Sequence, residues 1–312
     1  MSAIQESTDR QRAVGLSLSL ASAASNAVYV LAVRRATQAA SAQHVVLSLL
    51  FFAALFNTLS FAVKAAQGGL PARSSTERLL SLPSVLLSAL TVVGNFTASR
   101  TIELLHPAVA SVIIQLQVLF AATAAYAWLR ESISVAFALG SFVSLVGVGM
   151  MQWRDGGMGS NVLLGTLFGL ATATAFGLMQ VITRSVASRV DPLRFNAERL
   201  WLAVLWLSMI PGQLSGVLAL GGETVVLTAV AACFGPFLAR IALIYAARYL
   251  PAGLTTLMGL LSPVVVLAVS VPLLGTLPSG LELAGGALAI VGTLMIFTLI
   301  NDTLLSALRH IS

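Results

Sequence analysis

Long apolar stretches, separated by short polar segments, make up nearly the whole chain. Each stretch has the length of about 20 residues that an α-helix needs to cross a bilayer. The alternation of polar and apolar positions that a membrane β-barrel requires is absent. We therefore predict an all-α polytopic membrane protein with ten transmembrane helices, near residues 13–33, 44–64, 80–102, 107–129, 134–153, 161–184, 193–217, 224–247, 251–273 and 281–301.

The second half of the chain repeats the first half. An offset of 150 residues places helices one and two on helices six and seven, for example Arg34 on Arg184. Glycines that recur inside apolar helices mark positions of close packing between helices. An offset of 145 residues places helices three to five on helices eight to ten, with Leu116 on Leu261, Gly140 on Gly285 and Gly147 on Gly292.

Each half of the duplication holds five predicted spans, and we take residues 1–155 and 156–312 as the two domains. Because five is an odd number, the two copies cross the membrane in opposite orientations. Two inverted five-helix repeats are a transporter architecture. The pattern alone thus favours a transporter fold.

The positive charges lie mainly at the ends of the apolar stretches and are biased to one side. If the N-terminus is inside, the inner segments carry eleven lysines and arginines, and the outer segments carry only Arg34, Arg35 and Arg154. Cytoplasmic loops are enriched in basic residues, so we expect both termini in the cytoplasm. We expect a multi-pass protein of a bacterial inner or plasma membrane.

The composition excludes several other classes of protein. Hydrophobic residues make up 58% of the chain and charged residues 9%, whereas soluble proteins carry roughly a quarter charged residues. The net charge of +6 reflects membrane topology, so we expect no nucleic-acid partner. Cys233 is the only cysteine, which leaves no disulfide framework. Neither an HExxH motif nor paired intramembrane aspartates occur, so we expect no enzyme, no catalytic residue, no metal and no cofactor.

Several short motifs carry a resemblance to a known family. Residues 246–252 form a short basic and aromatic loop that leads into a proline-started helix, and Leu129-Arg130-Glu131 ends helix four with an acid. Ser262-Pro263, Leu273-Leu274-Gly275 and the glycines Gly285 and Gly292 follow in the second half. In order and spacing the chain resembles the EamA type of the drug/metabolite transporter superfamily over nearly its whole length.

The resemblance implies a substrate cavity between the halves, lined mainly by helices one, three, four, six, eight and nine. It also implies alternating access and export or exchange of small metabolites such as amino acids, without ATP. The run Gln115-Leu116-Gln117-Val118-Leu119 is similar to the nucleotide-sugar transporter branch, with Gln117 in place of a lysine. An exchanger of nucleotide-sugar-like or other phosphorylated solutes is therefore the alternative, and a non-transporting scaffold is a third.

Arg240 is the sharpest candidate for a substrate-binding residue. It lies eleven residues before Pro251, so roughly 16 Å from the cytoplasmic end of helix eight at the rise of an α-helix. An arginine near mid-membrane needs a partner or a water-filled cavity. Its guanidinium could bind a substrate carboxylate or phosphate, or it could belong to a structural ion pair.

Polar side chains on other spans add hydrogen-bonding capacity to the expected cavity. Asn26 and Tyr29 share a face of helix one, and Asn95 on helix three is the repeat partner of Arg240. Gln115 and Gln117 are two residues apart, so we expect only one to face the cavity and choose Gln117. Its repeat partner Ser262 precedes the helix-breaking Pro263. Each amide could equally serve as a contact between helices.

Three further residues are candidates for coupling or gating. Glu198 could pair with Arg240 or carry a proton, or it could pair with Arg194 or Arg199 near the cytoplasmic start of helix seven. His106, at the outer start of helix four near Glu103, could sense protons or could be a solvated loop residue. Arg100 lies on helix three. The expected partners are a small-molecule substrate, the lipid bilayer and a proton or counter-substrate, and the sequence does not indicate an oligomeric state.

Overall fold

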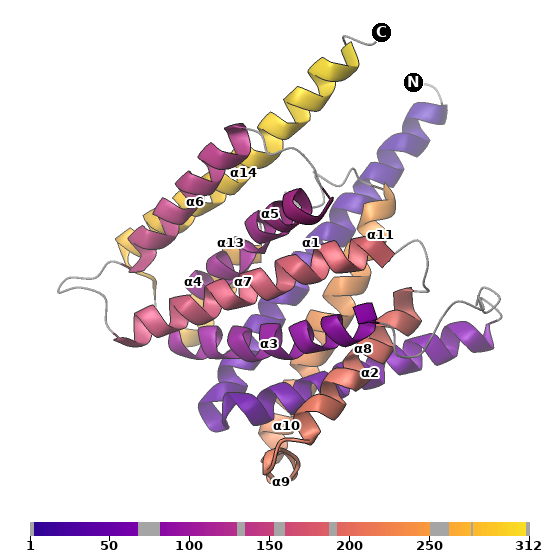
Figure 1. The fold of residues 1–312 in the computed structure, drawn as a ribbon, viewed down its shortest axis with the longest axis vertical. Helices are drawn as coiled ribbons and strands as arrows, with labels where there is room; N and C mark the ends of the chain where they lie inside the picture. Colours follow the sequence, from indigo (N-terminus) through magenta and orange to yellow (C-terminus); the bar gives the residue numbers. More distant parts are fainter. Residues whose placement is uncertain are drawn as a thin grey trace.

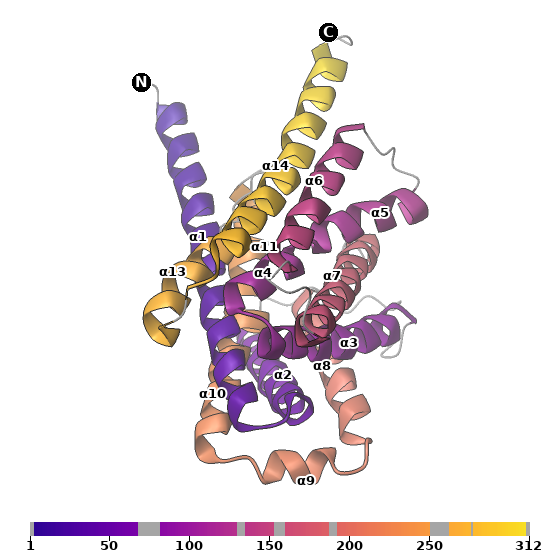
Figure 2. The ribbon, with the colours of Figure 1, turned by 90° about the vertical axis from the view of Figure 1, so that its left-hand side faces the viewer.

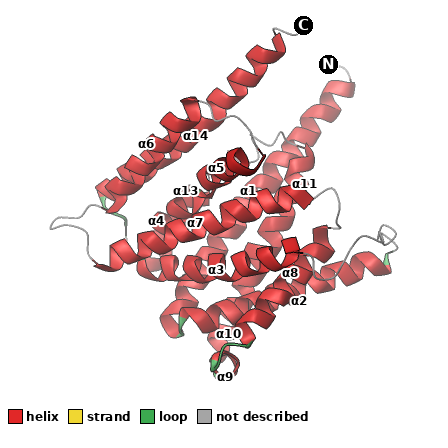
Figure 3. Ribbon diagram, in the orientation of Figure 1, coloured by secondary structure: helices red, strands yellow, loops and turns green. Residues whose placement is uncertain are grey.

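Helices follow the predicted spans in chain order. The computed structural model describes residues 3–67, 82–129, 135–152, 160–186, 192–249, 262–275 and 277–309. Within these ranges every regular element is a helix and none is a strand, as Figure 3 shows. The all-helical class predicted from the sequence is confirmed.

The five spans of the first half are α1 (Ala3–Ala39), α2 (Ala42–Ala66), α3 (Leu82–Leu104), the pair α4 (Pro107–Gln115) and α5 (Gln117–Leu129), and α6 (Val135–Gln152). The second half begins with α7 (Ser160–Val186), then α8 (Pro192–Ser208) and the short α9 (Gln213–Leu218). Span eight is continuous through α10 (Gly222–Ala232), the π-helix η1 (Cys233–Ala239) and α11 (Arg240–Tyr249). Spans nine and ten contain α13 (Ser262–Leu274) and α14 (Gly280–Arg309), and the predicted start of span nine lies outside the described residues.

Length and composition make five of the described helical stretches able to cross a membrane. They are Ala13–Ala39, Ala42–Ala66, Leu82–Leu104, Asn161–Thr183 and Gly222–Ala242. Shorter apolar helices cover Pro107–Ala121, Leu139–Met151, Ser262–Leu273 and Gly280–Gly292. Together with α8, these stretches occupy the ten spans that the sequence predicts.

Two spans are irregular near their middle. Around Leu116 the backbone makes tighter hydrogen bonds, from Leu116 N to Ile113 O (3.1 Å) and from Leu119 N to Leu116 O (2.9 Å), so α4 and α5 are separate helices. In span eight, Pro236 has no N–H and its ring would clash with the carbonyl one turn earlier, and the helix widens into η1 there. The expectation of one continuous helix over 107–129 is therefore wrong.

The two halves of the chain are interleaved. α1 packs on α10, η1, α11 and α13 of the second half, and its repeat partner α7 packs on α3, α4 and α5 of the first half. α2 packs on α8, and α6 packs on α14, which lie side by side in Figures 1 and 2. Exchanging the halves maps each of these contacts onto another contact or onto itself. The fold therefore has an approximate two-fold axis that relates the two repeats.

The recurring glycines lie where α6 crosses α14. A Cβ atom on Gly147 would lie 2.5 Å from the carbonyl oxygen of Gly285, and one on Gly292 would lie 2.5 Å from that of Gly140. Between these pairs, the Ser144 hydroxyl donates to Ala289 O at 3.0 Å. Ser144 and Ala289 are separated by the repeat offset of 145. The two-fold axis therefore passes through this contact, and the glycines provide the close packing that their recurrence predicts.

Both termini lie at one end of the bundle, which we call the termini end (Figures 1 and 2). The opposite end, which we call the far end, holds the last residues of α1 and α3 and the short helix α9. The chain turns there from α8 through α9 into α10, so α8 and α10–α11 run in opposite directions. The start of α8 and the end of α11 accordingly lie towards the termini end.

Candidate functional site

Asn26 and Ser262, two predicted substrate-binding residues, are in direct contact. Asn26 on α1 donates from Nδ2 to the Ser262 hydroxyl at the start of α13, over 2.7 Å. One turn earlier on α1, Ser22 donates to Ala239 O at the end of η1, over 2.9 Å. These bonds join α1 of the first half to two spans of the second half. The structure thus brings the pair together, and its role in binding a solute stays a prediction.

The matching contact in the other half is built from glutamines. Gln180 on α7 donates from Nε2 to Gln117 Oε1 over 3.0 Å, and Gln117 Nε2 donates to Gln115 Oε1 over 2.9 Å. Gln117 is the repeat partner of Ser262, so the two halves place polar contacts at equivalent positions, at the starts of α5 and α13. The interruption at Leu116 brings Gln115 and Gln117 together. The two amides thus contact each other although they are two residues apart, and the choice of Gln117 as the residue that faces a cavity stays a prediction.

Tyr29 and Asn95 lie on the predicted spans but make different contacts. Tyr29 is buried, and its ring packs on Gly235 of η1 so closely that a Cβ atom there would overlap it. Asn95 donates from Nδ2 to the backbone oxygen of Thr91 on its own helix, over 2.8 Å. This bond occupies the amide that was expected to match Arg240 in the repeat. Solute binding by Tyr29 or Asn95 stays a prediction.

A chain of polar side chains runs from α2 through Asn196 to Arg199 on α8. The guanidinium donates from Nη2 to Asn196 Oδ1 over 2.5 Å, and Asn196 donates from Nδ2 to Asn57 Oδ1 on α2 over 2.7 Å. Asn57 in turn donates to Ala53 O over 2.8 Å. Arg199 is only 6% exposed, and its Nε has no hydrogen-bond partner. A buried cation therefore has a single neutral partner.

Arg240 stands at the junction of η1 and α11, where its backbone leaves the π-helix. Its side chain is half-buried and lies close enough to Arg199 for the two positive charges to repel each other. Among the residues that the structure describes, none is a hydrogen-bond or ion-pair partner of Arg240. The structural ion pair that could have explained this arginine is thus not seen in the described part of the chain.

The sequence analysis missed Asn57 and Asn196 and weighed Arg199 only as a partner for Glu198. The signal was present, because Asn57 interrupts the apolar run Ala53–Thr58 and Arg199 lies inside a predicted span. Polar residues inside a membrane span are costly and mark functional or structural contacts. What the pattern did not supply is the pairing of α2 with α8, which brings these side chains together.

Glu198 does not pair with Arg240 in the structure. Its Oε1 lies 2.9 Å from Nε of Arg194, one turn earlier on the same helix. Both side chains are 23% exposed, towards the termini end of α8. The alternative that Glu198 pairs with Arg194 is confirmed, and its role in coupling stays a prediction.

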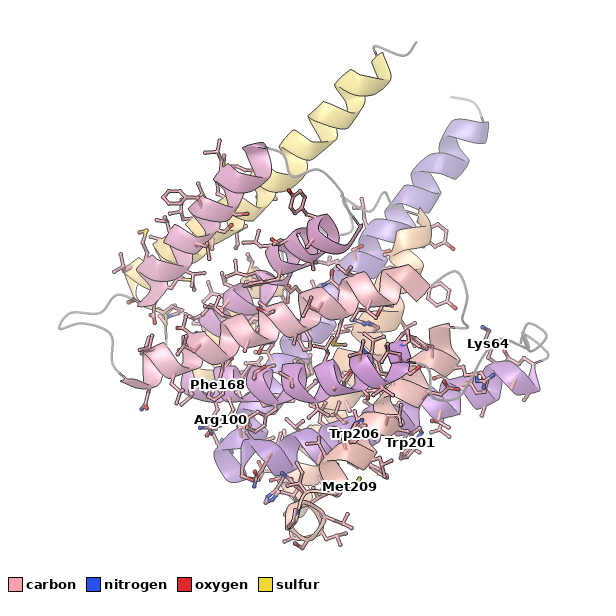
Figure 4. The ribbon with its side chains drawn as sticks, viewed as in Figure 1. Lys64, Arg100, Phe168, Trp201, Trp206 and Met209 are labelled. Atoms are coloured by element: carbon pink, nitrogen blue, oxygen red, sulfur yellow. The ribbon has the colours of Figure 1, made fainter. Side chains whose placement is uncertain are left out.

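The remaining gating candidates lie at the far end of the bundle. Arg100 Nη1 is 2.7 Å from Oε2 of Glu103, and its guanidinium carbon is 5.8 Å from the centre of the Phe168 ring. Figure 4 shows Arg100 beside Phe168, away from Trp201 and Trp206 on α8. His106 precedes Pro107 as the N-cap of α4, and its Nδ1 accepts from Ala108 N over 3.3 Å. Both residues therefore stabilise helix ends here, and gating by them stays a prediction.

A metal centre has no support in the described part of the chain. No group of three or more His, Cys, Asp or Glu side chains comes together among these residues. Cys233 is half-buried within η1, with a free thiol. The polar groups that do converge among these residues are amides, hydroxyls and guanidiniums, which act through hydrogen bonding and charge.

Comparison with known proteins identifies the family. A model of the EamA-like transporter family matches residues 13–153 and again residues 163–298, so each half matches separately. A solved structure described only as "Crystal structure of protein" is 21% identical and covers 92% of this chain and 98% of its own, with a TM-score of 0.60. It is among 26 solved chains that match, and it shows that the fold is a known one. No curated protein matches the chain. The two matches cover most of the sequence, and the chain belongs to the EamA-like transporter family, a family of multi-pass membrane transporters.

Proposed function

We propose that the protein is a secondary active transporter that exports small metabolites, amino acids or related compounds, by alternating access. The observation that carries this proposal is the polar interface between the interleaved halves. Side chains from different spans bond across it in seven pairs, Asn26–Ser262, Ser48–Thr228, Asn57–Asn196, Thr58–Trp201, Ser88–Trp206, Thr97–Thr172 and Gln117–Gln180.

Such an interface suits a transporter for a physical reason. Lipid tails give packed helices no hydrophobic force to hold them together, so polar pairs and small residues define which helices associate. A hydrogen bond between neutral side chains contributes only about 1 kcal/mol. The halves can therefore exchange such bonds for bonds to a solute at low cost. The irregular backbone at Leu116 and at Pro236 adds carbonyl groups to the same region, as in transporters with broken helices.

We also propose that the termini end faces the cytoplasm, in a bacterial inner or plasma membrane. The basic residues of the predicted inner segments, such as Lys64 at the end of α2 and Arg194 near the start of α8, support this orientation. Reporter enzymes fused to the C-terminus that are active on only one side of the membrane would test it. Activity of a reporter that works only outside the cytoplasm would show the opposite orientation.

A second candidate function is the exchange of phosphorylated solutes. It is favoured by Arg199 beside Arg240, because two neighbouring guanidiniums suit a doubly charged group better than one does. Under this alternative the two arginines would bind the solute phosphate. They would take over the role of the lysine that the nucleotide-sugar branch has at the position of Gln117. Counterflow of a sugar phosphate, but not of amino acids, would support this alternative over export.

Counterflow into liposomes tests the proposal directly. Purified protein is reconstituted into vesicles loaded with an unlabelled amino acid mixture, and uptake of each labelled amino acid is followed without ATP. We expect saturable uptake that empty vesicles lack and that a pH gradient changes. Asn26→Leu should slow this uptake, whereas Thr174→Val, which loses only a bond to its own helix, should not. Uptake equal to the passive leak for every solute, with a folded protein, would reject transport and leave a scaffold.

A further inference from the structure

Two arginines in the membrane-spanning helices have no negative partner among the residues that the structure describes. Arg199 is buried with an unpaired Nε and one amide partner, and Arg240 is half-buried near it without a described partner. A charge in the membrane interior is costly unless it is paired or solvated. Two like charges beside each other raise that cost further. In the described part of the chain the two arginines therefore form a positive region without a counter-charge.

The carboxylates whose side chains the structure describes are all engaged elsewhere. Glu103 pairs with Arg100, Glu198 with Arg194, and Glu223 with Arg35 over 3.6 Å at the far end. The carboxylate of Glu282 accepts from Ser279 N over 2.6 Å and closes the N-terminus of α14. In this part of the chain the protein offers no counter-ion to the two arginines. An anion from outside the chain would supply it.

The two arginines extend from helices that do not pack on each other. α8 packs on α2 and α3, whereas α11 packs on α1 and η1. Arg199 lies seven residues after Pro192, and Arg240 nine residues before Tyr249, so they are about 10 Å and 14 Å from the termini-end limits of their helices at 1.5 Å per residue. Arg199 and Arg240 therefore lie at similar depth along their helices, and the charge of Arg240 acts on Arg199.

The amides on α2 and α8 hold one of the guanidiniums in place. Asn57 fixes Asn196, and Asn196 Oδ1 accepts from Arg199 Nη2, which leaves Nε of Arg199 free to donate. A guanidinium presents its N–H groups as a planar fork that matches the two oxygens of a carboxylate or phosphate. A neutral solute could accept these hydrogen bonds but could not neutralise the charges. The geometry is thus built for a charged oxyanion.

We propose that Arg199 and Arg240 together bind an oxyanion, so that the transported solute carries a carboxylate or a phosphate. That the bound solute is also transported rests on the proposed function, whereas binding at this site can be tested without transport. Arg199 and Arg240 are the binding residues, and Asn196 and Asn57 position Arg199. A solute that has only neutral or cationic groups would not occupy the site.

Thermal unfolding of the detergent-purified protein tests the site with matched pairs of probes. Succinate is compared with its neutral analogue succinamide, and glucose 6-phosphate with glucose, at equal ionic strength set with sodium chloride. Phosphatidylglycerol added to the micelles is compared with phosphatidylcholine, because a lipid phosphate offers the same chemistry. We expect succinate or glucose 6-phosphate to raise Tm in a saturable manner, and the neutral analogues to leave it unchanged. Which of the two acts distinguishes carboxylate from phosphate.

Variants distinguish a binding role from a structural role, because the two roles predict opposite changes in the Tm measured without added oxyanion. Arg240→Gln should raise the Tm of the ligand-free protein, because it removes an uncompensated charge. It should also weaken the response to the oxyanion by about tenfold or more, as expected for loss of a charged hydrogen bond. Arg240→Lys keeps the charge and should retain part of the response. Arg194→Gln, on α8 with Arg199, removes an equal charge outside the pair and should leave the response unchanged.

The outcomes decide between the inference and its alternatives. A lowered ligand-free Tm in Arg240→Gln with an unchanged oxyanion response would assign Arg240 to a structural ion pair and overturn the site. Stabilisation by phosphatidylglycerol alone would place a lipid there and overturn the solute class. Transport of neutral solutes without any oxyanion response would also overturn it while the proposed function stands. Oxyanion binding without transport would support the site and reject the transporter.

Discussion

Arginines at the two ends of this bundle are treated in opposite ways. At the far end, Arg34 donates from Nη1 to the backbone oxygens of Ile102, Glu103 and Leu105, which end α3, and Arg100 pairs with Glu103. Towards the termini end, Arg199 and Arg240 lack a negative partner among the described residues. The first group stabilises the fold, and we propose that the second group binds an oxyanion. Arg34 and Arg100 lie near the carboxylate of Glu103, whereas the described residues give Arg199 and Arg240 no carboxylate partner.

The same difference should appear in what each arginine contributes to stability. A structural arginine leaves unpaired groups behind when it is removed, so its loss destabilises the protein. An uncompensated arginine relieves repulsion when it is removed, so its loss stabilises the empty protein. The variants below test this contrast in order of the effect that we expect, beginning with the largest.

Arg34→Ala should be the most destabilising of these changes. It leaves the last carbonyl groups of α3 without their donor and separates α1 from α3, and we expect a loss of about 3 kcal/mol from several unmet hydrogen bonds. Thermal unfolding in detergent measures it. The neighbouring Arg35→Ala is the control, since Arg35 pairs with Glu223 on an exposed surface and should change stability by less than about 0.5 kcal/mol. Equal losses of stability in Arg34→Ala and Arg35→Ala would show that Arg34 has no special structural role.

Asn196→Leu should have the next largest effect. The leucine keeps the volume of the side chain but takes away the acceptor of Arg199 and the donor to Asn57, and we expect a loss of about 2 kcal/mol. Asn196→Asp tests whether a negative charge at this position stabilises the protein, because it supplies a carboxylate beside Arg199. It should raise the Tm of the empty protein and weaken stabilisation by succinate or glucose 6-phosphate. A lowered Tm in both variants would show that Arg199 already has a counter-charge.

The sequence predicted the spans and their duplication because both depend on local periodicity. Apolar stretches set the helices, and the glycines that recur at one offset marked the contact of α6 with α14. The site was harder to predict because it depends on which spans pack together. Arg240 was found as an isolated polar residue in a span. The importance of Arg199 follows only from its contact with Asn196, which is bonded to α2, and from the nearby charge of Arg240 in α11.

Two local contacts show what helical periodicity can and cannot predict. A helix with an ideal turn would separate Gln115 from Gln117, but the tightened backbone at Leu116 turns them towards each other. The apolar residues around Gln115 and Gln117 in the sequence do not indicate that the helix is interrupted at Leu116. The partner of Glu198 was open between several arginines, and the choice of Arg194 follows from one helical turn on the same face. Local pairs of this kind are predictable, and pairs between distant spans require the fold.

A double-mutant cycle on Arg199→Gln and Arg240→Gln should show a smaller but specific effect. Either change alone relieves the same repulsion, so the second should stabilise less than the first, and we expect a coupling of about 1 kcal/mol. Unfolding of the wild type, both single variants and the double variant measures it. A cycle on Arg194→Gln and Arg240→Gln is the control and should be additive. Additivity in both cycles would mean that Arg199 and Arg240 do not sense each other.

Arg100→Gln should have the smallest effect on stability. Its ion pair with Glu103 is about one third exposed, with side chains at 31% and 29%, and its contact with Phe168 is at the long end of a cation–π interaction. Pairs of this kind contribute less than about 1 kcal/mol. Stability and the response to oxyanions should both stay close to those of the wild type, with Arg100→Lys as the charge-preserving control. Counterflow rates decide the remaining role of this residue: an unchanged rate assigns Arg100 to the end of α3 alone. A changed rate at unchanged stability would instead indicate that Arg100 takes part in gating at the far end. Both ends of the bundle would then have a role in transport, gating at one end and solute binding at the other.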